Sequence, residues 1–209
     1  MFNFKTREEL YEHLLNQSKV LTTPALQKAF EEIDRKDFVP ADYDIEAYED
    51  YPVPIGHGQT ISQPTTVGFM LELLDIEPGN KILDVGSGSG WTTALLAHLT
   101  GNTGRVYGVE RIPELVTLGQ RNLKKYPFPN ATIEQAQPKP GRSGELFDKI
   151  LVSAESEETP DALVKQLVPG GTIVLPVSGA ITKIQKKENG TYEEKRHPGF
   201  MFVPLILGK

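Results

Sequence analysis

The chain of 209 residues contains no cysteine. Disulfide bonds, thiolate zinc sites and a cysteine nucleophile are therefore excluded, although this absence does not decide the compartment. No stretch approaches the ~18 consecutive apolar residues of a membrane-spanning helix, so no membrane partner is predicted. Residues 1–9 also lack the apolar core of a secretory signal, which makes a cytoplasmic location the default expectation.

The sequence has no excess of basic residues either. Its 22 Lys and Arg stand against 28 Asp and Glu, giving a formal charge of −6. Proteins that bind nucleic acid usually carry a basic stripe, and none stands out, so no nucleic-acid partner is predicted. The histidines lack the spacing of metal ligands, and no metal site is expected; they are His13, His57, His98 and His197. A chain of this length fits one domain, and we expect a monomer.

From residue 64 onward, apolar strand-like runs alternate with helical patterns. The predicted strands are 81–85, 105–110, 130–135, 147–153 and 172–177, then 181–187 and 200–205 around a hairpin turn at Asn189-Gly190. The predicted helices begin at Pro64 and then cover 91–99, 113–125 and 158–168. This series predicts an α/β fold with a doubly wound, Rossmann-like, mostly parallel sheet, helices on both faces and an antiparallel C-terminal end.

The N-terminal part follows a different pattern. Helices are predicted over 6–19 and from Pro24, which suits a first helical position. Residues 36–60 show little periodicity and are rich in proline, glycine and tyrosine. A loop of this length is usually functional or disordered, and its aromatic residues argue against disorder. We therefore expect a single domain over 1–209, in which 1–60 is an appendage of helices and loop that covers the site.

The strongest local motif is a glycine turn between the predicted strand 81–85 and the helix that begins at Trp91. Gly86, Gly88 and Gly90 form a G-x-G-x-G spacing. Glycine adopts backbone angles closed to other residues and lets a ligand approach the main chain, and such a turn makes a nucleotide site at a strand's carboxyl end. The dinucleotide fingerprint is the wider G-x-G-x-x-G. The tighter spacing favours an adenosyl ligand without phosphates, S-adenosyl-L-methionine, over a plain glycine-rich turn.

Two carboxylates lie beside this turn. Glu110 ends the next predicted strand, 20 residues after Gly90, where a carboxylate can accept both hydroxyls of a ribose. Asp84 can hold the turn by accepting its N–H groups, or attract the cationic part of the cofactor. Ser62 precedes a predicted helix, and on its own it is best interpreted as an N-cap, since serine is a preferred cap.

Six stretches in chain order carry a resemblance to a known family. They are DFVP (37–40), PIGHGQTIS (54–62), LDVGSGSG (83–90), GVERIPEL (108–115), ILVSA (150–154) and QLVPGG (166–171). Together they resemble the protein-L-isoaspartate O-methyltransferase family, from about residue 20 to Leu205. The glycine turn is shared with most class I methyltransferases, whereas the loop at 56–62 is much more specific.

The resemblance implies the methyltransferase version of the Rossmann-like fold and a repair reaction on damaged proteins. The family transfers a methyl group from S-adenosyl-L-methionine to the free carboxylate of an L-isoaspartyl residue, and the ester then collapses to a succinimide that can reopen as aspartate. The expected partners are isoaspartyl-containing peptides or proteins.

The resemblance also assigns roles to individual positions. Ser62 matches the active-site serine of the family, and Thr60 is a second hydroxyl in the same loop. The cofactor-binding candidates are Asp84, Gly86, Ser87, Gly88, Gly90, Glu110, Arg111, Gln137, Gln59 and Ile61. The substrate-binding candidates are Ile55, Gly56 and Val203.

The sequence departs from the family pattern in three ways. Thr65 and Val67 stand where two histidines are usual, and Gln137 stands where an aspartate faces the adenine. A glutamine can still accept a hydrogen bond from the adenine amino group, without the charge that strengthens it. Residues 155–158 are acidic where alanines are common. Two alternatives therefore stay open: a binding module with weakened catalysis, and a carboxyl methyltransferase redirected to another, basic partner.

Overall fold

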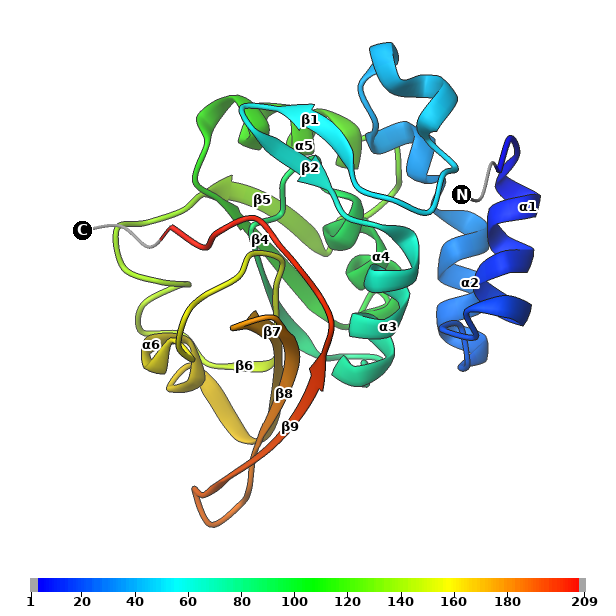
Figure 1. The fold of residues 1–209 in the computed structure, drawn as a ribbon. Helices are drawn as coiled ribbons and strands as arrows, with labels where there is room; N and C mark the ends of the chain where they lie inside the picture. The colour runs from blue at the N-terminus through cyan, green and yellow to red at the C-terminus, as the bar shows by residue number, and fades with distance from the viewer. Residues whose placement is uncertain (1–3, 207–209) are drawn as a thin grey trace.

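A seven-stranded sheet organises the computed structural model, which describes residues 4–206 (Figure 1). Its strand order is β5-β4-β3-β6-β7-β8-β9. The strands are β3 (Lys81–Val85), β4 (Arg105–Glu110), β5 (Ala131–Gln135), β6 (Phe147–Val152), β7 (Leu167–Val177), β8 (Ala180–Lys186) and β9 (Tyr192–Pro198). The first five in spatial order are parallel, and β8 and β9 are antiparallel. The predicted fold class is confirmed.

The central strands bury both of their faces. Alternate side chains of a strand point to opposite faces, and here they join two separate apolar clusters. One cluster packs under α3 (Pro64–Leu74), α4 (Trp91–Thr100) and α5 (Pro113–Leu123). The other contains Leu163 and Val164 of the short α6 (Asp161–Val164). No helix in the described part of the chain is long and apolar enough to cross a membrane.

The N-terminal elements extend the first cluster. They are α1 (Arg7–Glu12), which continues as a π-helix (His13–Gln17), then α2 (Pro24–Glu32) and two 3₁₀ turns (Arg35–Phe38 and Ala41–Glu46). Leu14, Leu26 and Phe30 from these elements are buried in the same cluster as the residues of α3 and α4. The N-terminal segment is thus packed against the helical face of the sheet.

Residues 52–62 form a β-hairpin where the sequence predicted an irregular loop. β1 (Val53–Gly56) pairs with β2 (Gln59–Ile61) in antiparallel fashion. Gly56, His57 and Gly58 turn the chain with positive φ angles of 92°, 54° and 70°. The strands are too short to show a period of two, and Pro54 weakens the pattern further because proline is confined to strand edges. The Gly-His-Gly run was the signal available in the sequence.

The predicted helix 158–168 is wrong in length, because only α6 is helical. The backbone just before it is engaged elsewhere: Ser156 N–H donates to Pro176 O, and Ser178 N–H donates to Ser156 O. β7 also begins earlier than predicted, at Leu167, because a bulge opposite β6 accommodates Pro169-Gly170-Gly171.

The predicted strand 200–205 is wrong as well. The turn at Asn189-Gly190 pairs Tyr192 with Lys186, so the second strand of the hairpin is β9. Residues 200–205 instead leave β9 and run across the edge of the sheet, as the red segment in Figure 1 shows, with a single bridge between Glu155 and Pro204. This apolar segment thus crosses the carboxyl ends of the strands instead of forming a further strand.

Because α6 supplies the helical cover of the second face, its packing is expected to matter strongly for stability. Leu163→Ala removes a side chain that is 0% exposed, and we expect it to lower the free energy of unfolding by about 2–5 kcal/mol. Leu146→Ala, at a position that is 51% exposed, is the matched control and is expected to change it by less than ~0.5 kcal/mol. Urea unfolding of both variants measures this, and equal losses would contradict the assignment.

Candidate active site

Three cavities lie in a row at the carboxyl ends of β3, β4 and β6. The large cavity has a volume of about 390 Å³, the small cavity about 60 Å³ and the outer cavity about 250 Å³. The large and small cavities share Gln59, Gly86, Glu110 and Ala154 in their walls. The small and outer cavities share Thr60, Ser62, Ser153 and Val203. The small cavity is therefore the junction of the other two.

The glycine turn forms one wall of the small cavity and is fastened to the neighbouring strand. Gly86 N–H and Ser87 N–H both donate to Val109 O, at 2.9 and 3.2 Å. Gly88, with φ of +52°, donates its N–H to Glu110 Oε2 at 3.1 Å. Gly90 lines none of the three cavities. A Cβ atom there would lie 3.1 Å from Gly119 O, so this glycine serves the close packing of α4 against α5.

Glu110 occupies the border between the large and small cavities, as predicted for a strand-end carboxylate. Its side chain is buried, and its two oxygens accept from Gly88 N–H (3.1 Å) and Ile112 N–H (2.8 Å). A carboxylate has about four lone-pair sites, so each oxygen keeps capacity for one more donor. Two acceptors fixed side by side suit a vicinal diol.

Asp84 differs from its predicted role in the turn. The turn's N–H groups go to Val109 and Glu110 instead, while Asp84 Oδ2 accepts from the hydroxyls of Thr92 (2.8 Å) and Thr93 (2.6 Å) on α4. Its Oδ1 has no hydrogen-bond partner among the described residues. Complete burial raises the pKa of the Asp84 carboxyl to about 6, against the opposing effect of the two threonine hydroxyls.

The small cavity brings together polar atoms from distant parts of the chain. Ser87 Oγ and Trp91 Nε1 are buried there without a hydrogen-bond partner among the described residues. Thr60 and Ser62 line the side formed by the segment from β2 to α3, next to the predicted Ile55 and Ile61. Convergent polar atoms without partners, set beside apolar side chains, are typical of one end of a ligand site.

The outer cavity gives access to Ser62 from the surface. Residues from three regions of the chain form its walls: Pro52, Thr60, Ser62, Gln63, Thr66, Ser153, Met201, Phe202 and Val203. Met201 is 94% exposed, so an apolar side chain stands open at this rim. The predicted substrate residue Val203 lines the cavity, whereas Gly56 lies in the hairpin turn and lines none of the three.

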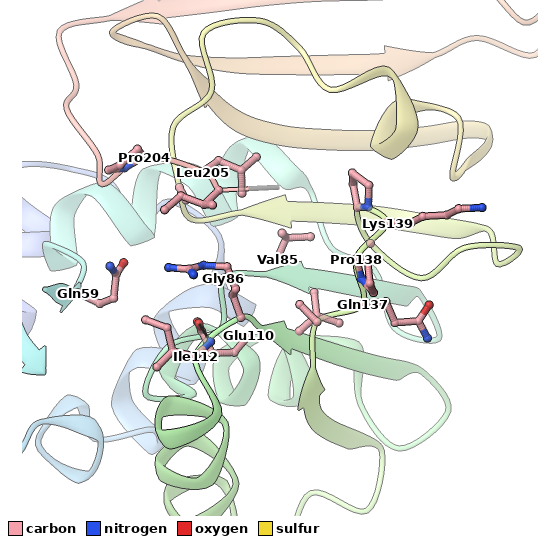
Figure 2. Close-up of a pocket in the computed structure, with 17 residues that line it drawn as sticks. Gln59, Val85, Gly86, Glu110, Ile112, Gln137, Pro138, Lys139, Pro204 and Leu205 are labelled. Carbon is pink, nitrogen blue, oxygen red and sulfur yellow. Dashed lines mark hydrogen bonds between the residues drawn. The ribbon is translucent and has the colours of Figure 1, made fainter. Parts of the chain in front are cut away.

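The large cavity contains residues that the sequence analysis did not select. Figure 2 shows Pro204 and Leu205 facing Glu110 and Ile112 across it. The other unselected residues in its wall are Val85, Val109, Ala136, Pro138, Lys139, Pro140, Gly141, Ala154 and Ile206. Val85, Val109 and Ala154 lie in stretches that carry the family resemblance, but the others belong to no motif, and only the fold could bring them together.

The divergent positions affect the cavities little. Arg111 and Gln137 line the large cavity, but Gln137 is exposed and its side chain points away from Glu110 in Figure 2. Thr65 donates from its N–H (2.9 Å) and its hydroxyl (2.7 Å) to the carboxylate of Asp50. Val67 is buried in the apolar cluster and lines none of the three cavities. The two changed histidine positions therefore serve internal contacts here, Thr65 through hydrogen bonds and Val67 through packing.

The raised pKa of Asp84 predicts an unusual pH dependence of stability. Between pH ~4 and ~6 the unfolded chain loses this proton while the folded protein keeps it, so stability falls as pH rises through that window. About two pKa units correspond to about 3 kcal/mol. The wild type is therefore expected to lose about 3 kcal/mol of unfolding free energy through this group between pH 4 and pH 7. Asp84→Asn cannot titrate at this position and is expected to show none of that loss. Parallel profiles in urea unfolding at the two pH values would contradict the assignment.

These observations fit an S-adenosyl ligand. A large, mostly apolar cavity ends at the two acceptor oxygens of Glu110, and a small chamber follows with Ser87 Oγ in its wall. Asp84 is fully buried at the strand end that precedes the turn and lines none of the three cavities. Buried carboxylates suit a positively charged ligand group better than a phosphate.

Comparison with known proteins agrees with this fit. The sequence model of the protein-L-isoaspartate(D-aspartate) O-methyltransferase family matches residues 5–209. A protein-L-isoaspartate O-methyltransferase of Aeropyrum pernix is 43% identical over 92% of this chain and 76% of its own length, and one of Methanopyrus kandleri is 40% identical over 97% and 92%. A Plasmodium falciparum protein described under the same name, crystallised with S-adenosyl-L-homocysteine, superimposes with a TM-score of 0.85 at 27% identity, covering 97% of this chain and 99% of its own. The chain belongs to the protein-L-isoaspartate(D-aspartate) O-methyltransferase family.

Proposed function

We propose that this chain methylates the free carboxylate of L-isoaspartyl residues in peptides or proteins, with S-adenosyl-L-methionine as the methyl donor. One observation carries the proposal: Thr60 and Ser62 line both the small cavity and the outer cavity. Two hydroxyl donors thus lie where a carboxylate entering from the surface would meet a group held beneath the glycine turn.

The residues around the large and small cavities suit each part of the cofactor. Glu110 would accept hydrogen bonds from the two ribose hydroxyls, and Ile112, Pro204 and Leu205 would contact the adenine. Ser87, in the wall of the small cavity, would face the amino-acid end, with the buried carboxyl of Asp84 at the strand end that precedes the turn. When bound, S-adenosyl-L-methionine supplies an electrophilic methyl group attached to a positively charged sulfur.

The chain needs no strong general base for this reaction. An isoaspartyl carboxylate with a pKa near ~4 is already ionised at neutral pH, so the protein has only to orient it. Ser62 and Thr60 donate hydrogen bonds that aim the carboxylate without neutralising it. Ile55 and Ile61, both buried in the wall of the small cavity, exclude water. Alignment of the carboxylate with the methyl group in a site without water is enough to accelerate the transfer.

A buried arginine holds these hydroxyls in place. The guanidinium of Arg35 donates to Ser62 O at 3.1 Å and to Tyr51 O at 3.0 Å, and also to Ala47 O and Glu49 O. Arg35 is only 3% exposed, so these carbonyl oxygens accept the hydrogen bonds that water would otherwise accept. The loop that carries the catalytic candidates is thereby tied to the N-terminal segment.

Three further expectations belong to this proposal. The whole chain acts as one domain in which residues 1–60 cover the site. It works as a monomer, and it works in the cytoplasm. These remain predictions from the sequence.

Removal of the Ser62 hydroxyl tests the reaction directly. Ser62→Ala is expected to lower kcat/KM for an isoaspartyl peptide about 10- to 100-fold, since a hydrogen bond to a charged group contributes about 1.5–3 kcal/mol. Ser143→Ala, at an exposed serine, is the matched control and should leave the rate unchanged. Transfer of a radiolabelled methyl group measures both. A wild-type protein that binds S-adenosyl-L-homocysteine but labels no isoaspartyl peptide would contradict the proposed substrate.

The proposed ribose contact predicts a loss of cofactor affinity. Glu110→Gln keeps the size of the side chain but removes its charge and one acceptor oxygen, and we expect S-adenosyl-L-homocysteine to bind about 10- to 100-fold more weakly. Glu114→Gln, an exposed neighbour in the first turn of α5, is the control. Titration calorimetry gives both dissociation constants, and equal affinities would remove Glu110 from the site.

A further inference from the structure

Glu155 makes an unusual number of contacts with the end of the chain. Residues 199–206 form an extended segment, here called the C-terminal strap. Glu155 N–H donates to Val203 O at 2.8 Å, and Leu205 N–H donates to Glu155 O at 2.6 Å. The Glu155 side chain adds two more bonds, because Oε2 accepts from Phe202 N–H at 3.3 Å and Oε1 from Gly179 N–H at 2.5 Å. One residue therefore links the strap to the turn before β8.

The strap forms part of the wall of all three cavities. Its first half, with Met201 and Phe202, lines the outer cavity, and Val203 lines both the outer and the small cavity. Pro204 and Leu205 line the large cavity (Figure 2). The change from one cavity to the next thus occurs between Val203 and Pro204, within the stretch that the backbone of Glu155 holds from both sides.

The strap has few other hydrogen-bonded anchors near these walls, while Phe202 and Leu205 pack against the two apolar clusters. At its start, Gly199 N–H and Phe200 N–H both donate to Gly179 O, at 3.0 and 3.2 Å. The Phe200 ring stacks on Phe69 of α3, with centroids 5.6 Å apart. Beyond Phe200, Glu155 is the partner in all the backbone bonds of the strap given above. Removing its carboxylate would free Phe202 N–H and Gly179 N–H together.

The acidic run 155–158 has two possible uses, and the contacts separate them. Glu157 and Glu158 are exposed and available to a basic partner. Glu155 is half-buried, and both of its carboxylate oxygens already accept backbone N–H groups. The first residue of the run therefore acts inside the molecule, toward the site.

We propose that Glu155 is a positioning residue that fixes the C-terminal strap, so that a single segment shapes the cofactor side and the substrate side of the site together. This inference rests on the proposed function for its substrate half. Its consequence is coupling: a loosened strap should weaken the binding of cofactor and peptide at once, while the hydroxyls of Thr60 and Ser62 stay in place.

The test compares Glu155→Ala, Glu155→Gln and the control Glu158→Ala, which removes the same charge from an exposed position. For Glu155→Ala we expect S-adenosyl-L-homocysteine to bind about tenfold more weakly and KM for an isoaspartyl peptide to rise about tenfold, with kcat within about threefold of wild type. Glu155→Gln keeps one acceptor oxygen and is expected to fall between wild type and Glu155→Ala. Hydrogen exchange at the Phe202 and Gly179 amides should become about tenfold faster in Glu155→Ala, faster by a smaller factor in Glu155→Gln, and stay unchanged in Glu158→Ala.

The possible results decide the proposal. Unchanged exchange at Phe202 together with unchanged affinity for S-adenosyl-L-homocysteine overturns it, and so does a loss confined to one of the two ligands. Should Glu155→Ala fail to fold, Glu155→Gln carries the same comparison. Exchange and S-adenosyl-L-homocysteine binding require no isoaspartyl substrate, so a wild-type protein that methylates no such peptide refutes the proposed function without touching these two readouts.

Discussion

The site depends on one hydrogen bond between the ends of two neighbouring strands. Because β3 and β4 are parallel and adjacent, their carboxyl ends meet at the same edge of the sheet. Gly88 N–H at the end of one strand reaches Glu110 Oε2 at the end of the other, at 3.1 Å. This bond sets the turn, places the carboxylate at the border of the two inner cavities and leaves lone pairs for a ligand. In this chain of the S-adenosylmethionine-dependent O-methyltransferase family, the geometry of two parallel strands thus places the glycine turn and Glu110 together.

The substrate side is built differently, from segments that lie far apart in the chain. Arg35 ties residues 47–62 to the N-terminal helices through four carbonyl oxygens. Its guanidinium also lies 5.5 Å from the ring of Trp91, which lines the small cavity. On the opposite side, Glu155 holds the C-terminal strap. Two charged side chains bonded mainly to backbone groups therefore hold the loops above a rigid sheet, which is how sites on loops gain precision.

Much of this could be predicted from the sequence where local pattern and fold agree. The strand–turn–helix at 81–100 was recognisable because buried strands and glycine turns leave a continuous signature. Short elements were not: β1 and β2 hold too few residues for periodicity, and α6 has only four. Asp84 lies beside the turn as predicted, but its partners are the hydroxyls of Thr92 and Thr93 in the first turn of α4. Side-chain partners of this kind depend on how α4 lies on the sheet.

The sequence by itself determined the fold class, the glycine turn, the position of Glu110 and the hydroxyl loop at 60–62. Each of these features depends on residues that are adjacent in the chain and on their own conformational preferences. Only the tertiary structure decided which apolar residues surround the cofactor side and how the C-terminal strap closes the site. The apolar pattern of the strap predicts a strand over 200–205, yet Tyr192–Pro198 pairs with β8. The place beside β8 was therefore taken, and Phe202 N–H, Val203 C=O and Leu205 N–H of the strap pair with Glu155 instead.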